Sequence, residues 1–281
     1  MKLLIEKNTS NFDNLKTDGI ILSLKDYSVQ STIYYELDEI KKIINKYPKL
    51  EVFIKMNKNI FNDEIDKLKE VLIELNKLNI KGIFFYDLAI LNIKQELDLD
   101  VDLVWDQSHM VNNYRTCDYY YNEGVKYALL GKEITLEEIK EIVEKSKITS
   151  MVEVVSTPAI AYSKRKLLTN YYKSINKAKK DTLEILEKVT NKYYIVKESN
   201  NGTSFYTKDI MNGTSIIKDL YSVNTPYIIM REDGVPDFDE LVNDTHEFIE
   251  NKCKDEEYIE KYKKLGDNTN FFFKETMYKV K

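Results

Sequence analysis

The chain has 281 residues, of which 43% are hydrophobic and 32% charged, so it can bury the core of one large domain or two small ones. Only 8 glycines and 4 prolines are present, which excludes a disordered or low-complexity protein. The net charge of -5 excludes a surface that is basic throughout, although a local basic patch stays compatible with it.

Strand-like and helix-like segments alternate regularly in the first half of the chain. Short apolar runs such as "GIILSL" predict buried strands, and apolar residues at helical spacing predict the helices between them. Thr135 and Glu138 form the pattern of a capping box at the start of one helix. The predicted strands are 19–24, 51–57, 81–87, 101–106, 125–133 and 150–156, and the predicted helices are 36–47, 65–75, 88–97, 111–124 and 135–146.

The second half begins with a break in this alternation. "KDTLEILEKV" (180–189) is interpreted as a helix, and 192–209 is predicted to be an inserted β-hairpin, because two β-rich runs flank an Asn-Asn-Gly turn. A helix at 214–223, a further strand at 226–233 and a helix at 237–252 follow. The tail, 254–281, is expected to pack on the barrel, with an edge strand at 268–281.

Repeating strand–helix units without a GxGxxG fingerprint favour a parallel α/β barrel over a doubly wound sheet. The period of these units is typical of parallel strands joined by helices. A doubly wound dinucleotide-binding sheet is less favoured, because its glycine motif is absent. We therefore predict an α/β fold, a (β/α)8 TIM-type barrel that is either closed or incomplete, formed by residues 1–281 as a single domain.

Polar residues follow several predicted strands, at the end of the barrel where active sites of this fold lie. Such residues line a pocket in some proteins and merely turn the chain in others. Lys132 and Glu133 end one strand together and could form a solvated ion pair or face the barrel mouth. The candidates are Asn57, Asp87, Asp106, Lys132, Glu133, Ser156 and Arg231.

Other reactive side chains give weaker signals. His109 could act as a general acid or base, but no paired nucleophile motif accompanies it, so a surface or capping role is favoured. His246 is expected on a helix surface, and Cys117 is expected to be a buried helical thiol. Trp105 is expected in the core. Without a CxxC or Cys/His cluster, this chain is expected to bind no metal or iron–sulfur cluster by itself.

The start of the chain and the hydropathy of the whole sequence bear on where in the cell the protein is expected. "MKLLIEKNTSNFDNLK" turns polar too early for a signal peptide, and no stretch approaches about 20 apolar residues. We therefore expect a cytoplasmic protein with reduced thiols and no membrane association.

"AYSKRKLLTNYYK" (161–173) is the most unusual segment, with four cations and three tyrosines in thirteen residues. Arginine and lysine here could hold a carboxylate or phosphate, and the tyrosines could stack on a base. From spacing alone, an amphipathic helix with Leu167 and Leu168 buried and its lysines in water is favoured.

This segment resembles "HGALCISYSGRCLLSNY", the hallmark of the collagenase-like peptidase family of unknown mechanism, class U, family 32. Further similarity lies in "GVKYALLGKEITLEEIKEI" and in the segments around the strand ends, and the resemblance spans about 50–233. The matching positions are Asn57, Asp87, Lys132, Glu133, Tyr162, Ser163, Arg165, Leu167, Leu168, Asn170, Tyr171, Lys208 and Asp209.

The chain also departs from that family pattern. Val155 stands where the family has histidine, and Ala159 and Lys166 stand where it has cysteines that ligate an iron–sulfur cluster. The resemblance therefore implies a short paralogue without a cluster, next to a full-length paralogue that carries one. Such a pair resembles the family's tRNA-hydroxylating members, which place oxygen on carbon 5 of a wobble uridine, with prephenate as the implied oxygen source.

Three functions follow from the resemblance. In the first, the chain is a subunit for tRNA hydroxylation that is not active alone. Arg165, with Lys164 and Lys166, would bind prephenate carboxylate or tRNA phosphate. Tyr162 and Tyr171 would shape the pocket, and Asn170 would brace it. The second is a peptidase, as the family name implies, although no Ser/His/Asp, Cys/His or HExxH arrangement is visible. The third is a non-catalytic scaffold, for which Arg165→Ala would leave hydroxylation intact.

Overall fold

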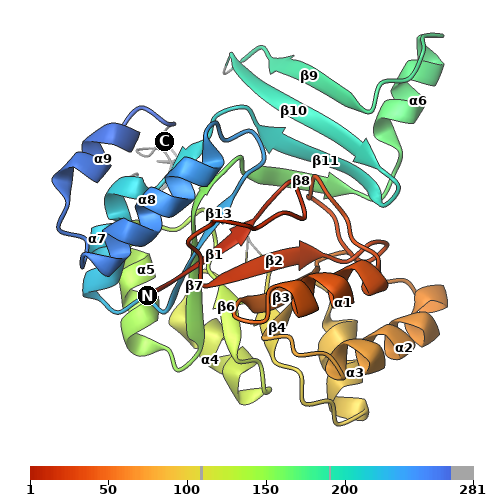
Figure 1. The fold of residues 1–281 in the computed structure, drawn as a ribbon. Coiled ribbons are helices and arrows are strands. Elements are labelled where there is room, and N and C mark those ends of the chain that lie inside the picture. Colours follow the sequence, from red (N-terminus) through yellow and green to blue (C-terminus); the bar gives the residue numbers. More distant parts are fainter. Residues whose placement is uncertain (108–109, 190, 267–281) are drawn as a thin grey trace.

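A computed structural model describes residues 1–107, 110–189 and 191–266 of the chain. Its centre is a closed barrel of eight parallel strands, with β1 hydrogen-bonded to both β2 and β13 (Figure 1). The barrel strands, in ring order, are β1 (Lys2–Glu6), β2 (Gly19–Ser23), β3 (Glu51–Met56), β4 (Gly82–Phe85), β5 (Leu103–Trp105), β6 (Tyr127–Leu129), β7 (Thr149–Ser156) and β13 (Tyr227–Arg231). The predicted TIM-type barrel is confirmed, and it is closed.

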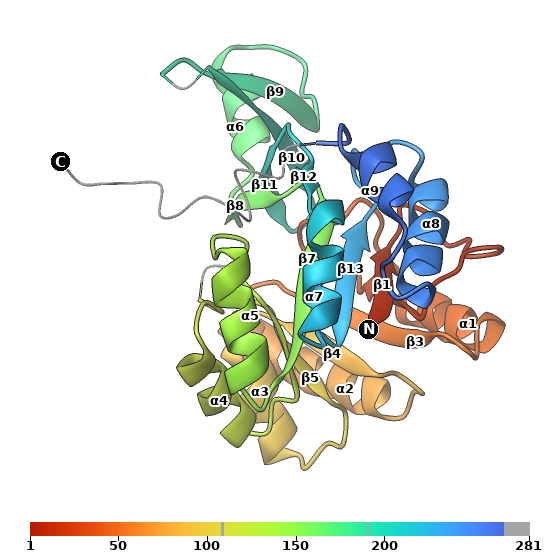
Figure 2. The same cartoon turned by 90° about the vertical axis from the view of Figure 1, so that its left-hand side faces the viewer.

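Helices surround the barrel on its outer side (Figures 1 and 2). They are α1 (Leu37–Lys46), α2 (Ile65–Asn76), α3 (Leu88–Glu96), α4 (Tyr114–Asn122), α5 (Leu136–Lys145), α7 (Ile217–Ser222), α8 (Phe238–Glu250) and α9 (Glu256–Tyr262), with short 3-10 turns η1 (Asn62–Glu64) and η2 (Thr214–Ile216). The predicted capping box at the start of α5 is present, since Thr135 and Glu138 bond reciprocally. Residues 7–18 join β1 to β2 without a helix.

Two apolar layers hold the barrel together. The interior contains one or two side chains from every barrel strand, with Phe53 at its centre in edge-to-face contact with Phe84, Tyr127 and Tyr227. A larger layer fills the space between the strands and the outer helices. Trp105 belongs to this outer layer and stacks on Tyr120, which confirms its predicted place in the core.

A second sheet is inserted between β7 and β13 and lies over the carboxyl ends of the barrel strands (Figure 1). Its antiparallel strands, in sheet order, are β8 (Ala159–Ser163), β11 (Gly202–Thr207), β10 (Lys192–Ser199) and β9 (Thr182–Glu187). Helix α6 (Leu167–Ser174) packs Leu168 and Tyr172 against Val196 of this sheet. The short β12 (Met211–Asn212) then returns the chain to the end of β7.

One expectation for these elements is wrong, and one strand was not predicted. The segment 180–189, predicted as a helix, contains strand β9, because Leu183 and Ile185 alternate with exposed residues and β10 offers a free partner edge. Strand β1 was not expected, since its apolar run is short, yet it closes the ring. The expected hairpin at 192–209 matches β10 and β11. The expected edge strand at 268–281 lies outside the described residues.

Candidate functional site

A cavity of about 360 Å³ lies at the barrel mouth, between the carboxyl ends of the strands and the inserted sheet. Seven barrel strands carry a side chain that points to the barrel axis at this level, because successive side chains on a strand alternate between axis and outer layer. Each stands two positions after an apolar residue of the interior, as Glu6 follows Leu4 and Lys55 follows Phe53. These axis-facing residues are Glu6, Ser23, Lys55, Tyr86, Asp106, Glu153 and Arg231. Six of these side chains line the cavity, whereas Ser23 is buried and donates to Glu6.

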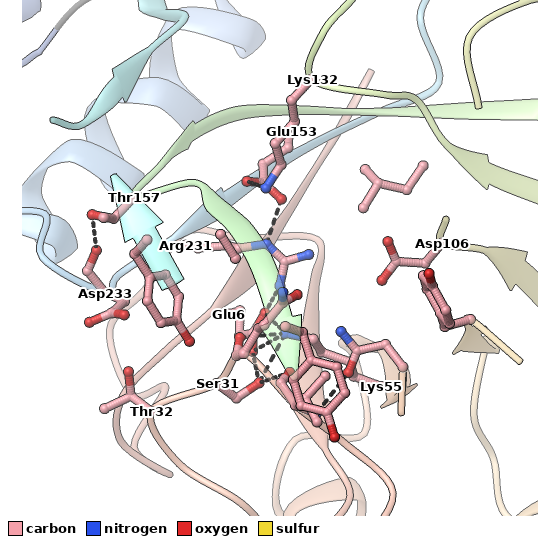
Figure 3. A pocket seen from close by; sticks show the side chains of 18 of the residues that line it. Glu6, Ser31, Thr32, Lys55, Asp106, Lys132, Glu153, Thr157, Arg231 and Asp233 are labelled. Atoms are coloured by element: carbon pink, nitrogen blue, oxygen red, sulfur yellow. Dashed lines mark hydrogen bonds and ion pairs between the residues drawn. The ribbon is translucent and has the colours of Figure 1, made fainter. Parts of the chain in front are cut away.

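Arg231 holds the centre of an ion network in this layer (Figure 3). Its guanidinium pairs with the carboxylate of Glu6 on one side, and its Nε donates to Glu153 at 2.6 Å on the other. Lys132 reaches the second oxygen of Glu153 at 2.6 Å. Burial lowers the pKa of Arg231 to about 10, so the side chain stays charged at neutral pH. We call Glu6, Lys55, Lys132, Glu153 and Arg231 the mouth network.

Lys55 completes the mouth network from β3. Its ammonium lies 3.2 and 3.3 Å from the two oxygens of Glu6 and donates to the Gln30 carbonyl and the Ser31 hydroxyl, each at 2.9 Å. Burial lowers the pKa of Lys55 to about 8, while the nearby carboxylate of Asp106 acts in the opposite direction. The contacts hold the ammonium in place and use its three protons.

Asp106 faces the mouth network from across the cavity (Figure 3). It is only 8% exposed, and its carboxylate has no hydrogen bond or ion pair with any residue that the structure describes. Burial raises the pKa of Asp106 to about 6; Lys55 and Lys132 lower it, and Glu153 adds to the rise. Asp106 is therefore a carboxyl group that can hold or release a proton near neutral pH.

The wall as a whole is balanced in charge. Four cations and four carboxylates line it, and three of the carboxylates are already paired with cations. The eight residues are Glu6, Lys7, Lys55, Asp106, Lys132, Glu153, Arg231 and Asp233. A cavity of this kind suits a small polar molecule, including a carboxylate that takes the place of a wall carboxylate beside its cation, rather than a large polyanion.

The inserted sheet forms the roof of the cavity. Ala159, Tyr162 and Tyr206 line it from above. The Tyr162 hydroxyl donates to the Asn201 carbonyl, and the Asn201 amide donates to the Ser28 carbonyl of the β2–α1 loop at 2.8 Å. This chain of hydrogen bonds fastens the tip of the β10–β11 hairpin to the barrel.

Of the residues predicted from the sequence, five line the cavity. They are Asn57, Asp106, Lys132, Tyr162 and Arg231. Asn57 is nearly buried and accepts from the Val29 amide at 2.9 Å, so it fixes a wall loop. Lys132 faces the barrel mouth, which is one of the two placements expected for it. Its ion-pair partner is Glu153 rather than Glu133.

The other predicted residues lie elsewhere. Asp87 caps α3, accepting from the Ala89 amide at 2.9 Å. Ser156 is buried and donates to Glu153, behind the cavity wall. Glu133 is exposed. Outside the wall on the inserted unit are Ser163, Lys164, Arg165, Asn170 and Tyr171.

Glu6, Lys55 and Glu153 were missed by the sequence reasoning. Each is a charged residue inside an apolar strand, in "LLIEK", "VFIKM" and "MVEVV". A charge inside an apolar strand is a usable signal, because burying an unpaired charge costs on the order of several kcal/mol. Such a residue is therefore expected to have a partner of opposite charge at a site. Following the alternation two positions on from the interior residues Leu4, Phe53 and Met151 would have placed all three on the axis-facing side near the mouth.

The cysteines do not fit an iron–sulfur cluster. Cys117 lies on α4 and Cys253 follows α8, and both are buried in the outer apolar layer. Burial raises the pKa of Cys117 to about 12 and that of Cys253 to about 11, so both thiols stay protonated. Within residues 1–107, 110–189 and 191–266, no group of three or more His, Cys, Asp or Glu side chains could hold a metal ion.

Hydrolytic arrangements find little support in the part of the chain that the structure describes. Ser156 contacts only a carboxylate that is itself paired with Arg231 and Lys132, and such a carboxylate is a weak base. His246 lies on helix α8, where its Nδ1 is 3.6 Å from the carboxylate of Glu250 on the same helix. His109 lies outside the described residues. No described helix combines the length and apolar content needed to cross a membrane.

Comparisons with known proteins add to this picture. A family model described as peptidase family U32 matches residues 11–264. "tRNA hydroxylation protein P2" of Bacillus subtilis (strain 168) is 27% identical over 253 residues, which cover 81% of this chain and 81% of that protein. "tRNA hydroxylation protein P1" of the same organism is 25% identical over 157 residues, covering 55% of this chain and 37% of P1. Among solved structures, the U32 peptidase Mk0906 is similar with a TM-score of 0.47 and 16% identity, over 56% of this chain and 70% of that chain.

Proposed function

Because this chain belongs to peptidase family U32, we propose that it acts in tRNA hydroxylation, as do the relatives whose names describe that process. The observation that carries the proposal is the match to protein P2, which covers 81% of both chains. A match of that extent aligns the barrel together with the inserted unit rather than the barrel alone. The proposed product is tRNA with 5-hydroxyuridine at the wobble position.

We further propose that the chain works with a full-length paralogue. In support, protein P1 matches this chain over only 37% of its own length, so P1 has much sequence that this chain lacks. The chain's two cysteines are buried and protonated and do not fit a cluster. The redox chemistry would therefore lie with the paralogue, and this chain would not hydroxylate tRNA alone.

We place a small co-substrate, proposed to be prephenate, in the cavity at the barrel mouth rather than at Arg165. Arg165 lies on the outside of the inserted unit, whereas Lys132 and Arg231 lie at an enclosed wall. A dicarboxylate there would exchange partners with Glu153, and it would be repelled by Asp106 in its charged form. Asp106→Asn should therefore tighten prephenate binding at pH 7.5, as measured by calorimetry on the purified chain.

The experiment that tests the function is mass spectrometry of nucleosides from total tRNA, in cells with and without the gene for this chain. Loss of 5-hydroxyuridine on deletion, and its return with the wild-type chain, would support the proposal. Complementation with a Lys55→Met, Arg231→Met double variant tests the cavity, with protein levels measured in parallel. Unchanged nucleosides on deletion would overturn the proposal and favour a peptidase.

A scaffold role makes a different prediction for the same cells. A chain that only stabilises its paralogue would restore hydroxylation with any folded variant, including the Lys55→Met, Arg231→Met double variant. A chain that binds co-substrate in the cavity would not restore hydroxylation with that double variant. Comparing the level of the paralogue with the level of 5-hydroxyuridine separates the two roles.

A further inference from the structure

The inserted unit carries a local excess of positive charge in a chain whose net charge is -5. No Asp or Glu occurs from Val154 to Lys180, and seven Lys or Arg residues fall between Lys164 and Lys180. The segment comprises β8, α6 and the loop that leads to β9. Such a block in an acidic protein is a local feature and not a consequence of overall composition.

Three of these seven cations have partners inside the protein. Lys164 lies 3.0 Å from the centre of the Phe61 ring, and Lys166 donates to the Ser199 carbonyl at 2.5 Å. Lys179 pairs with Asp181 at 2.7 Å and with Glu198 at 3.1 Å. The Lys164 contact ties the start of the segment to the barrel unit, and the Lys166 and Lys179 contacts hold the segment on the inserted sheet.

The other four are Arg165, Lys173, Lys177 and Lys180. All four are exposed, and none forms an ion pair with a described residue. Because α6 turns Leu168 and Tyr172 toward the sheet, the opposite side of the helix faces water. Tyr171 is 47% exposed beside them. We call Arg165, Tyr171, Lys173, Lys177 and Lys180 the α6 surface.

Four unpaired cations next to an exposed aromatic ring match the chemistry of a nucleic-acid backbone. Lysine and arginine neutralise phosphates and release counterions, and an exposed tyrosine can stack on an unpaired base. No Asp or Glu lies between Arg165 and Lys180, and the adjacent Asp181 is paired with Lys179, in contrast to the mouth cavity, where carboxylates balance the cations. Electrostatics thus separates a polyanion site from a small-molecule site.

The position of α6 fits this role. It lies at the end of the inserted sheet away from α9, while β8, which precedes it directly, lines the cavity (Figure 1). RNA held on the α6 surface would thus lie next to the unit that roofs the barrel mouth. A single short turn, at 164–166, joins the two sites.

We propose that the α6 surface binds the phosphodiester backbone of RNA. Naming tRNA as that RNA rests on the proposed function. The surface then positions the tRNA, whereas the mouth cavity holds the small co-substrate. The exposed cations act together, so removing one should have a modest effect and removing four a large one.

The test measures binding of an unmodified tRNA transcript by fluorescence anisotropy, from 50 to 200 mM salt, with the full chain alone and together with its full-length paralogue. The variant is Arg165→Gln, Lys173→Gln, Lys177→Gln and Lys180→Gln combined. The matched control is Lys42→Gln, Lys49→Gln, Lys67→Gln and Lys218→Gln, four exposed lysines of the barrel unit without described ion pairs, with the same change in net charge. Unchanged thermal unfolding shows that both variants fold.

We expect the α6 variant to bind tRNA at least about tenfold more weakly at 50 mM salt. We also expect its slope of log affinity against log salt to be smaller by about 3, since each lost phosphate contact removes roughly 0.7 to 0.9. The control variant should change both quantities little. Equal losses in the two variants would overturn the proposal.

Two further outcomes separate this proposal from its alternatives. If the α6 variant binds tRNA normally but no longer binds the paralogue, the surface docks a protein, and the proposal is wrong. If the α6 variant loses tRNA binding while deletion of the gene leaves 5-hydroxyuridine unchanged, the RNA surface stands and the hydroxylation function fails. If the α6 variant binds tRNA normally while deletion of the gene abolishes 5-hydroxyuridine, the hydroxylation function stands and the proposed RNA surface is wrong.

Discussion

Asp106 is the residue whose protonation the cavity alters most clearly. Its native pKa of about 6 lies above the ordinary value of 3.8, so the folded state binds more protons than the unfolded state between these two pH values. Stability therefore falls as the pH rises through this window, and the full penalty is present above pH 6. The penalty is the cost of keeping a charged carboxylate in a nearly buried place.

Asp106→Asn should remove that penalty. We expect the free energy of unfolding at pH 7.5 to rise by on the order of 1 to 3 kcal/mol, because one unit of pKa shift corresponds to about 1.4 kcal/mol. The gain should vanish below about pH 3, where Asp106 is protonated in both the folded and the unfolded state. Urea denaturation at the two pH values checks this, and an equal gain at both would show that charge is not the cause.

Arg231 is the residue on which the mouth network depends. Arg231→Met leaves Glu6 and Glu153 with Lys55 and Lys132 as their remaining partners, and we expect a loss of about 3 kcal/mol, the lower end for a broken buried pair. Lys145→Met removes an exposed pair with Glu141 and should cost less than about 0.5 kcal/mol. Equal effects in denaturant unfolding would contradict the assigned burial.

Sequence reasoning reached two of the five residues of the mouth network, Lys132 and Arg231, and also Asp106, which faces the network. Lys132, Arg231 and Asp106 follow or end recognisable strands, so their places at the mouth could be predicted. Glu6, Lys55 and Glu153 were not predicted, because β1 was not recognised as a strand and because a single charge inside an apolar run such as "MVEVV" also occurs on strands that face solvent on one side. In this closed barrel of parallel strands both faces of each strand are covered, so such a charge lies among other buried groups.

At the scale of elements, the hairpin β10–β11 shows a sequence signal that determined structure. Its turn places Gly202 at φ +135°, where an added Cβ would lie 2.3 Å from the Ser163 carbonyl oxygen. A residue with a side chain cannot adopt this geometry without moving β8. The Asn-Asn-Gly sequence therefore specifies both the turn and the approach of β8 to β11.

Gly202→Ala should loosen the inserted sheet. We expect a cost of about 1 to 3 kcal/mol from backbone strain and the clash with β8, seen as faster proteolysis within 157–210. Gly124→Ala is the matched control, because Gly124 also has a positive φ, of +87°, but nothing lies near its absent Cβ. If both variants are cleaved at the same rate, the contact with β8 does not matter.

Strand β9 shows the opposite case. The apolar residues of "TLEILE" fit the spacing of a helix nearly as well as that of a strand, and the neighbouring lysines give no turn signal. The choice was made by β10, whose edge pairs with it over Thr182–Glu187, and by the small core under α6. Local propensity could not decide, because the partner edge is a tertiary feature.

At the scale of the whole molecule, the barrel and the inserted unit differ in their cores. The barrel has an interior and an outer apolar layer, whereas the inserted unit has a small core built around Leu168, Tyr172 and Val196. Free energy of opening follows the apolar area that a unit buries. The inserted unit should therefore open while the barrel stays closed.

Hydrogen–deuterium exchange tests this difference in the wild-type chain. Amides of β9 and β10 should exchange at least about tenfold faster than those of β7 and β13, a difference of about 1.4 kcal/mol in opening free energy. Binding of tRNA at the α6 surface should slow exchange in the inserted unit and not in the barrel. Equal protection of both sheets in the free chain would mean that they open as one unit.

The sequence alone determined the class of the fold, the inserted hairpin and the basic segment after β7, because these depend on periodicity, turn chemistry and composition within short stretches. Tertiary structure alone decided that the barrel closes, that β9 is a strand, and that Glu6 meets Arg231 from the other end of the chain. It also separated Arg165 from the cavity, although Tyr162, three residues earlier, lines it. The physical reason is that a charge is placed by the ring of strands that surrounds it, and that ring forms only when β1 pairs with β13.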